Sequence, residues 1–284
     1  MRILVTNDDG VRAPGIAALT RAVVGAGHDV VVVAPLVDYS GAGAAVGPIH
    51  SRQGVDYETH VLEGIAEVPA FGIDGPPALA AMLTCVGAFG PMPDLVLSGI
   101  NHGANVGRST LHSGTVGAAL TAAHFGLRAL AVSLRFGEDP VPWDTPATVA
   151  LALVDLLAQA PPATVLNVNV PDVPLARVAG VRRARLGTSG TIRSAVHEAA
   201  GPAEAHIALP PAPSGTLRLD LAPPRTGTSQ DPGTDATLLS HDHVTVTALT
   251  GVREARGADA VAEQAVAAAA AALAAGSGQR RVAG

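Results

Sequence analysis

The chain has 284 residues, 48% of them hydrophobic, so it can bury a full core as one large domain with or without an appendage. The net charge is −6 and no basic run exceeds Arg182-Arg183, which argues against nucleic-acid and anionic-membrane partners. Cys85 is the only cysteine, which excludes a disulfide framework and a cysteine-rich zinc site. We see no signal-peptide pattern and no apolar run of the ~20 residues that a membrane span needs. We therefore expect a cytoplasmic protein.

The first two-thirds of the chain alternate short β-branched segments with helical ones. The β-branched segments are apolar along their whole length, which is typical of parallel strands covered on both faces. This order predicts an α/β fold, a Rossmann-like three-layer sandwich with a mostly parallel sheet, over residues 1–180. Strands are predicted at Arg2–Thr6, Asp29–Ala34, Asp94–Leu97, Leu130–Leu134 and Thr164–Val170, and helices at residues 15–24, 77–88, 115–125 and 145–158.

Residues 181–250 have a different composition, rich in proline, glycine and threonine, with alternating stretches at His206–Leu209, Thr216–Leu221 and Val244–Leu249. Such alternation predicts antiparallel strands, and the prolines between them remove ladder donors. We expect a β-rich oligomerisation arm that packs on another subunit. Residues 251–284 are predicted to form a C-terminal helix, over about residues 258–275, and a tail.

Two adjacent carboxylates, Asp8 and Asp9, follow the first predicted strand. Ligands of an open parallel sheet bind at this edge. A dinucleotide site would place a glycine-rich turn here, whereas paired carboxylates repel a phosphate unless a cation lies between them. The pair therefore indicates a metal site. The alternative is a helix cap, but capping requires only one aspartate and the next helix begins several residues later.

Neutral oxygen ligands follow two other predicted strands. Ser40 lies in the loop after the second strand, and Asn101 lies in the glycine-rich loop after the strand at Asp94–Leu97. With Asp8 and Asp9 they form an all-oxygen set, which suits one Mg²⁺ or Mn²⁺ ion per subunit better than zinc.

A second group of polar residues is suited to hold a phosphate. Ser113, Gly114 and Thr115 precede a predicted helix, where hydroxyl and free N–H groups attract anions. Ser113 can equally be an ordinary N-cap. The chain has no lysine and few asparagines, so Asn105, like Asn101, is interpreted as retained for its amide, against the alternative of turn preference. The same question stays open for Asn167 and Asn169.

Six segments of the sequence carry a resemblance to a known family. They are ILVTNDDG at 3–10, VVAP…SGA at 32–42, PDLVLSGINHGANVG at 93–107, SGTVGAA at 113–119, LNVNVPD at 166–172 and TDATLLSHDHVTVTAL at 234–249. In this order they resemble the SurE survival-protein phosphatases, which are 5′/3′-nucleotidases. The resemblance implies a Rossmann-like core, a C-terminal segment exchanged between subunits, and a homodimer or homotetramer.

The resemblance also implies roles for individual residues. The positions that match the family's metal ligands are Asp8, Asp9, Ser40 and Asn101, and those that match its phosphate site are Asn105, Ser113 and Thr115. Two departures lie next to the expected substrate. Gly43-Ala44-Ala45 stands where the family usually has Ser-Asn-Ser, and His112 replaces the usual aromatic residue before SGTVGA.

These observations predict a divalent-metal-dependent phosphatase acting on nucleoside monophosphates or a related small phosphomonoester. Water would attack phosphorus, oriented by a free oxygen of Asp8 or Asp9, with Asn105 and Ser113 completing the catalytic set. A phosphatase for a non-nucleotide metabolite and a non-catalytic phosphate-binding module are the alternatives. An aspartyl-phosphate mechanism fits poorly, because it needs carboxylates two residues apart and a lysine. His102 and His112 flank the site, but a lone histidine is more often a polar or packing residue than a general acid.

Overall fold

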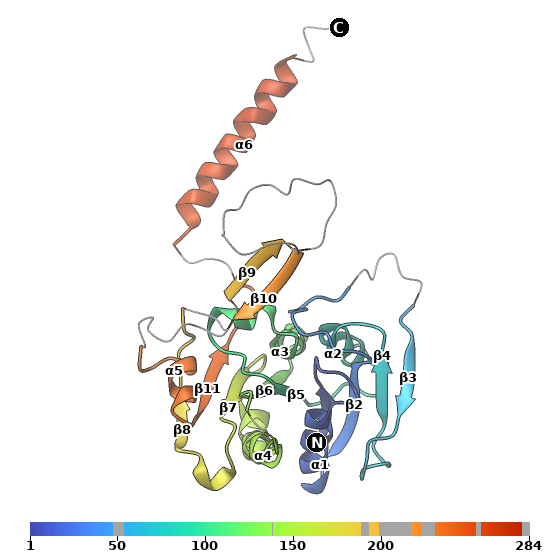
Figure 1. Ribbon diagram of the computed structural model, residues 1–284. Coiled ribbons are helices and arrows are strands. Elements are labelled where there is room, and N and C mark those ends of the chain that lie inside the picture. The colour runs from blue at the N-terminus through green and yellow to red at the C-terminus, as the bar shows by residue number, and fades with distance from the viewer. Residues whose placement is uncertain are drawn as a thin grey trace. The chain divides into compact units, whose positions relative to one another are not determined.

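The computed structural model describes residues 1–47, 54–137, 139–188, 193–198, 217–222, 231–253 and 257–279. The chain divides into two compact units, Met1–Leu249 and Thr250–Gly284. A nine-stranded sheet of order β3-β4-β2-β1-β5-β6-β7-β11-β8 forms the centre of the first unit (Figure 1). Its strands are β1 (Arg2–Thr6), β2 (Asp29–Pro35), β3 (Tyr57–His60), β4 (Ala70–Ile73), β5 (Leu95–His102), β6 (Arg128–Leu134), β7 (Val165–Val170), β8 (Gly180–Arg183) and β11 (His243–Leu249).

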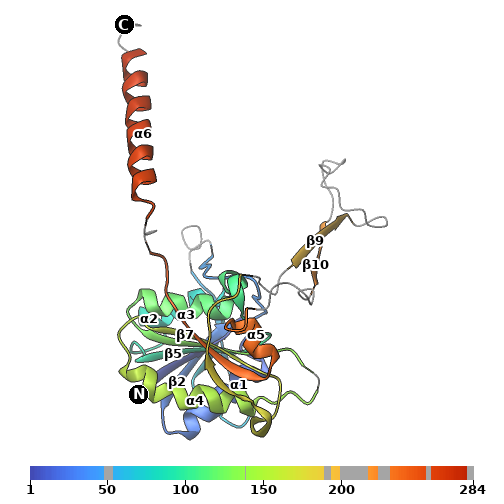
Figure 2. The same ribbon diagram turned by 90° about the vertical axis from the view of Figure 1, so that its left-hand side faces the viewer.

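Helices cover both faces of this sheet, so the unit has three layers (Figure 2). Helices α1 and α4 pack together on one face, and α2 and α3 pack together on the other. The short α5 contacts β11 and β7. The helices of this unit are α1 (Pro14–Gly25), α2 (Pro77–Cys85), α3 (Gly114–His124), α4 (Asp144–Gln159) and α5 (Asp235–Ser240), with the 3-10 turns η1 (Gly107–His112) and η2 (Leu175–Arg177).

The apolar core is split by the sheet, because successive side chains of a strand point to opposite faces. Ile3 and Val5 of β1 are buried with Ile16 of α1, whereas Leu4 is buried with Leu79 of α2. All five of these side chains are at most 1% exposed. This explains why the strand sequences are apolar throughout, and it confirms the predicted α/β three-layer fold.

The predicted strands and helices of the core correspond to β1, β2, β5, β6, β7 and α1–α4. Four strands were not predicted, namely β3 and β4 in the core, β8 at the end of the sheet, and β9 (Arg193–Glu198). Three of the four β3 residues are exposed, so β3 lacks an apolar alternation, and β4 has only four residues and includes Gly72. The segment after Leu97, predicted as a loop, continues β5 to His102 with a register shift between Ser98 and Asn101.

The predicted arm begins too early and ends too late. Strands β8 and β11 both belong to the main sheet, where β11 runs antiparallel to β7 and parallel to β8. The prediction that residues 181–250 form a separate arm is therefore wrong for these two strands. The interrupting prolines lie outside both strands and leave their hydrogen bonds intact.

Within the range of the predicted arm, β9 (Arg193–Glu198) and β10 (Leu217–Ala222) form a two-stranded sheet of their own. The predicted strand at His206–Leu209 lies outside the described residues. The second unit contains α6 (Asp259–Gln279), which covers the predicted C-terminal helix. Across the described ranges, no helix is both long and apolar enough to cross a membrane.

Candidate functional site

The predicted ligands gather where the strand order reverses. From β1 the chain proceeds to β2 on one side and later to β5 on the other, and Thr6 at the end of β1 pairs with Ser98 of β5. Such a reversal opens a crevice at the carboxyl ends of the strands. Asp8 and Asp9 follow β1 directly into this crevice.

Asp8 joins β1 to the N-terminus of α3. Its side chain is 3% exposed, Oδ2 accepts the Thr115 N–H at 3.0 Å, and Oδ1 accepts the Thr115 hydroxyl. Asp8 can approach the helix this closely because Gly114 has no side chain. A Cβ at Gly114 would lie 2.9 Å from Asp8 Oδ2. The backbone N–H and the hydroxyl of Thr115 thus both donate hydrogen bonds to Asp8. The predicted phosphate contact of Thr115 is not supported by this arrangement, in which Thr115 instead holds Asp8 in place.

Asp9 is bound to the other side of the crevice, where its Oδ2 accepts the backbone N–H of His102 at 3.2 Å. Burial, followed by repulsion from Asp8 and Asp38, raises the pKa of Asp9 to about 6. Burial also raises the pKa of Asp8, although its two hydrogen bonds from Thr115 oppose the rise. The ion pairs found among the described residues include neither carboxylate. This donor set therefore lacks a compensating cation and suits a bound one.

The loop that carries Ser40 is fastened to this carboxylate pair through its backbone. Tyr39 N–H donates to Asp8 O at 2.8 Å, and Gly43 N–H donates to His112 O at 2.9 Å. Ser40 itself is exposed, and its N–H donates to Asp38 Oδ1 at 2.7 Å. Within the described ranges, the Ser40 hydroxyl makes no hydrogen bond to the other predicted ligands.

Asn101 is oriented so that its oxygen remains available. The side chain is 8% exposed, and Nδ2 donates to Gly103 O at 2.5 Å. Because the nitrogen is engaged, Oδ1 is the atom left to bind a cation. The part of the chain that the structure describes holds no group of three or more His, Cys, Asp or Glu suited to a metal. That finding is compatible with the predicted set, in which only Asp8 and Asp9 are of these types.

Asn105 lies further along the same edge and is held by residues of β6 and β7. Its N–H donates to Asn169 Oδ1 at 2.7 Å, its Nδ2 donates to Ser133 Oγ at 2.8 Å, and its carbonyl accepts from Asn167 and Asn169. One of the two Nδ2 hydrogens remains for a ligand. The asparagines whose role the sequence left open thus position Asn105.

Ser113 is the N-cap of α3, because its Oγ accepts the Val116 N–H at 3.1 Å. The ordinary capping role is therefore confirmed, and the hydroxyl hydrogen stays free to donate to an anion. Gly114 contributes a first-turn N–H at the same helix end. Neither the His102 nor the His112 imidazole is hydrogen-bonded to a site residue among the described residues.

Two acidic residues of the site were missed by the sequence analysis. Asp38 repels both Asp8 and Asp9. Asp235 is fully buried and accepts the N–H groups of Gly107 at 2.8 Å and Gly187 at 3.0 Å, so it fixes the end of the Asn105 loop. Asp235 belongs to the TDATLL segment, and that match was the signal that could have identified it.

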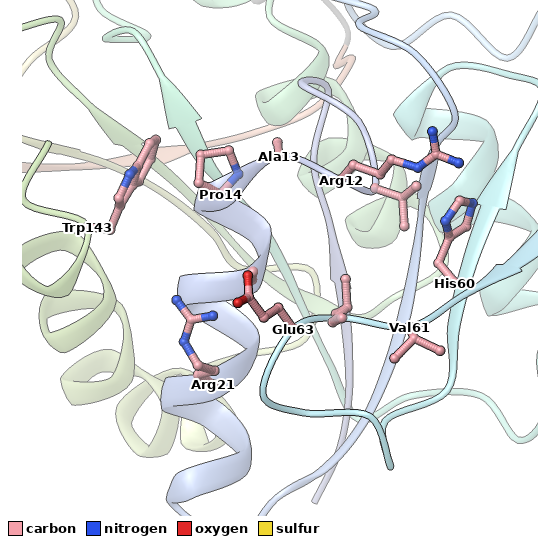
Figure 3. Close-up of a pocket in the computed structure, with 11 residues that line it drawn as sticks. Arg12, Ala13, Pro14, Arg21, His60, Val61, Glu63 and Trp143 are labelled. Atoms are coloured by element: carbon pink, nitrogen blue, oxygen red, sulfur yellow. The ribbon is translucent and has the colours of Figure 1, made fainter.

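A pocket of about 420 Å³ lies beside the N-terminus of α1 and contains none of the predicted ligands. Figure 3 shows Trp143 beside Pro14 at one side and His60 with Arg12 at the other. The hydrogen-bonded carboxylates, and not this pocket, mark the chemical site.

The sequence and the fold of this chain match those of known proteins. Residues 3–193 match the family described as survival protein SurE. The 5′-nucleotidase SurE of Legionella pneumophila (strain Lens) is 35% identical over 254 residues, covering 88% of this chain and 90% of that protein. The 5′/3′-nucleotidase SurE of Edwardsiella ictaluri (strain 93-146) is 37% identical over 265 residues, covering 91% and 93%. The crystal structure of SurE from Aquifex aeolicus superposes with a TM-score of 0.67 at 30% identity, covering 88% and 93%. This chain belongs to the SurE family.

Proposed function

We propose that this protein is a divalent-metal-dependent phosphomonoesterase that hydrolyses nucleoside monophosphates. The single observation that carries the proposal is the contact between Asp8 and Thr115, because it places a buried carboxylate against the helix terminus suited to a phosphate. The names of the relatives, 5′-nucleotidase and 5′/3′-nucleotidase, support nucleotides as the substrate class.

The metal ligands proposed are Asp8, Asp9, Ser40 and Asn101, and the ion is Mg²⁺ or Mn²⁺. A cation bound there would neutralise charge on the phosphoryl group and lower the pKa of water in the site. The donor chemistry supports this choice, since the buried Asp8 and the partly buried Asp9 repel each other and the Asn101 amide leaves its oxygen free. All four ligands are hard oxygen donors.

The two aspartates have different roles in this proposal. Both oxygens of Asp8 accept hydrogen bonds from Thr115, so Asp8 is held as a fixed ligand. Asp9 uses only Oδ2 for His102, which leaves Oδ1 to orient the attacking water. Asp9 is therefore the residue that accepts the proton of that water.

The phosphate is held by neutral donors. The Ser113 hydroxyl, the Gly114 N–H and the second hydrogen of Asn105 Nδ2 can each donate to a phosphate oxygen. The chain has no lysine that could contribute a positive charge. The partial positive charge at the N-terminus of α3 takes part of that role.

The test is phosphate release from an aryl phosphate and from a panel of nucleoside monophosphates. We expect activity with Mg²⁺ or Mn²⁺, none after chelation, and none in Asp8→Asn or Asp9→Asn. The matched control is Asp155→Asn, at an exposed position of α4, which should retain full activity. Full activity of the metal-stripped protein, or of either site variant, would show that the proposal is wrong. Activity confined to non-nucleotide phosphates would favour the specialised phosphatase instead.

We also infer that the protein acts as a cytoplasmic homodimer or homotetramer. Strands β9 and β10 pair with each other and, within the described residues, with no other strand. An isolated hairpin is marginally stable in water, and packing on a second subunit would stabilise it. Light scattering at micromolar concentration should give a multiple of 28.3 kDa. A single 28.3 kDa species would exclude this assembly.

A further inference from the structure

Three aromatic rings gather beside Asp9 at the carboxyl ends of β5 and β6. The centroid of the His102 ring lies 4.8 Å from that of Phe136 and 5.5 Å from that of Trp143. The backbone N–H of His102 donates to Asp9. The cluster is therefore attached directly to a proposed metal ligand.

Phe136 is the outer ring of this cluster, with 70% of its surface exposed. The ring also lies close to Gly103, where a Cβ would come within 2.9 Å of a ring carbon. Gly103 stands between Asn101 and Asn105 in the chain. An exposed aromatic face thus borders the loop that carries both a proposed metal ligand and a proposed phosphate ligand.

The inner part of the cluster contains an unsatisfied polar atom. Nε2 of His102 is buried and has no hydrogen-bond partner among the described residues. Leaving such an atom unpaired costs about 1–3 kcal/mol, so a purely structural role for the ring is poorly explained. Trp143, on the other side of His102, also lines the pocket near Pro14 (Figure 3). The cluster therefore borders open space as well as the site.

We propose that Phe136, supported by His102 and Trp143, is the surface on which the base of the nucleotide substrate stacks. This inference rests on the proposed function. Every base has a π-face that can stack on an aromatic ring, and Phe136 offers such a ring at the surface. An exposed apolar ring next to a polar phosphate site matches the two ends of a nucleotide.

A second cluster provides a matched control. The Tyr57 ring lies 6.0 Å from Phe71 and 5.9 Å from Phe89, and Tyr57 is 60% exposed. Tyr57 belongs to β3, which β4 and β2 separate from β1 and its Asp8. Removing Tyr57 therefore removes a similarly exposed ring that contacts none of the proposed metal or phosphate ligands.

The experiment uses Trp143, the only tryptophan, as a fluorescent probe of binding. Wild type, Phe136→Ala, Phe136→Tyr and Tyr57→Ala are titrated with adenosine monophosphate and, separately, with inorganic phosphate, each with Mg²⁺ present. We expect Phe136→Ala to weaken nucleotide binding roughly 5- to 150-fold and to leave phosphate binding unchanged. Phe136→Tyr, which keeps a ring, and Tyr57→Ala should both match wild type. The same pattern should appear in KM for the nucleotide.

Unchanged nucleotide binding in Phe136→Ala would overturn the inference, and so would an equal loss of nucleotide and phosphate binding. A change in oligomeric state with unchanged nucleotide affinity would show that another subunit covers the ring. If wild type and Phe136→Ala hydrolyse adenosine monophosphate identically, the stacking surface is contradicted and the proposed function is not. Wild type that neither binds nor hydrolyses this nucleotide contradicts the proposed function as well.

Discussion

The carboxylate of Asp9 should destabilise the metal-free protein at neutral pH. Its pKa is raised from 3.8 to about 6 on folding, so the folded state holds the proton more tightly than the unfolded state does. Protonated Asp9 therefore favours the folded state. This contribution to stability is complete below pH 3.8 and is lost as the pH rises through 6. Above that range, the ionised Asp9 costs about 3 kcal/mol.

Replacement by asparagine removes this cost while keeping the shape of the side chain. In chelator at pH 7.5, we expect the free energy of unfolding of Asp9→Asn to exceed that of wild type by up to about 3 kcal/mol. At pH 4 the difference should nearly vanish. The amide oxygen can still accept the His102 N–H, so no buried donor is left unpaired.

Urea unfolding, followed by the fluorescence of Trp143 at equal protein concentrations, measures both values. Asp155→Asn, at an exposed position of α4, should show no such difference between the two pH values. Added Mg²⁺ should stabilise wild type far more than Asp9→Asn, because a ligand that binds only the folded state raises stability. A metal-free Asp9→Asn protein no more stable than wild type at pH 7.5 would refute this reasoning.

Three further outcomes are expected. Gly117→Ala should lower the free energy of unfolding by about 1–3 kcal/mol, because its Cβ would lie 2.1 Å from Gly43 O. The displaced Ser40 loop should also reduce activity. The control in thermal unfolding and activity assays is Gly25→Ala, whose Cβ would have open space around it. Asp235→Asn should weaken inhibition by inorganic phosphate roughly 5- to 100-fold and leave metal affinity unchanged, since one buried N–H loses its acceptor. The control is Asp231→Asn, four residues earlier in the chain, where the carboxylate pairs with Arg185. An equal loss of phosphate inhibition in both variants would contradict this prediction. Hydrolysis at a chiral phosphorus should proceed with inversion, and a trapped phosphoryl-enzyme would contradict direct attack by water.

The carboxylates were predictable because they lie directly after the first strand. A buried apolar strand followed by Asn7, Asp8 and Asp9 defines the position of the two carboxylates with few residues. The hydrogen bonds from Thr115 to Asp8 could not be predicted in the same way. The same helix terminus that attracts a phosphate also attracts a neighbouring carboxylate, and sequence spacing cannot show that Asp8 reaches it first.

The contribution of the distant chain was not predictable in the same way. Asp235 reaches the Asn105 loop across 128 residues of sequence, and only tertiary structure brings it there. The alternation of Asn167 and Asn169 does place both side chains on one face of β7, but the sequence does not show that Asn105 lies on that face. The strand β5 beyond Leu97 was missed because glycine normally indicates a loop, whereas Gly99 is required there by the close approach of Val132.

The closeness of Arg185 and Thr234 has a consequence for protein engineering. These residues form an isolated bridge, and Arg185 N–H donates to Gly233 O while Asp235 N–H donates to Arg185 O. Arg185 and Thr234 therefore lie next to each other where the chain leaves the core and returns to it. A short linker could join these two positions in place of the segment between them. A short glycine-serine linker in place of residues 188–230 should leave a folded single-subunit core, whereas cutting the chain after Gly180 also removes β11 and should not.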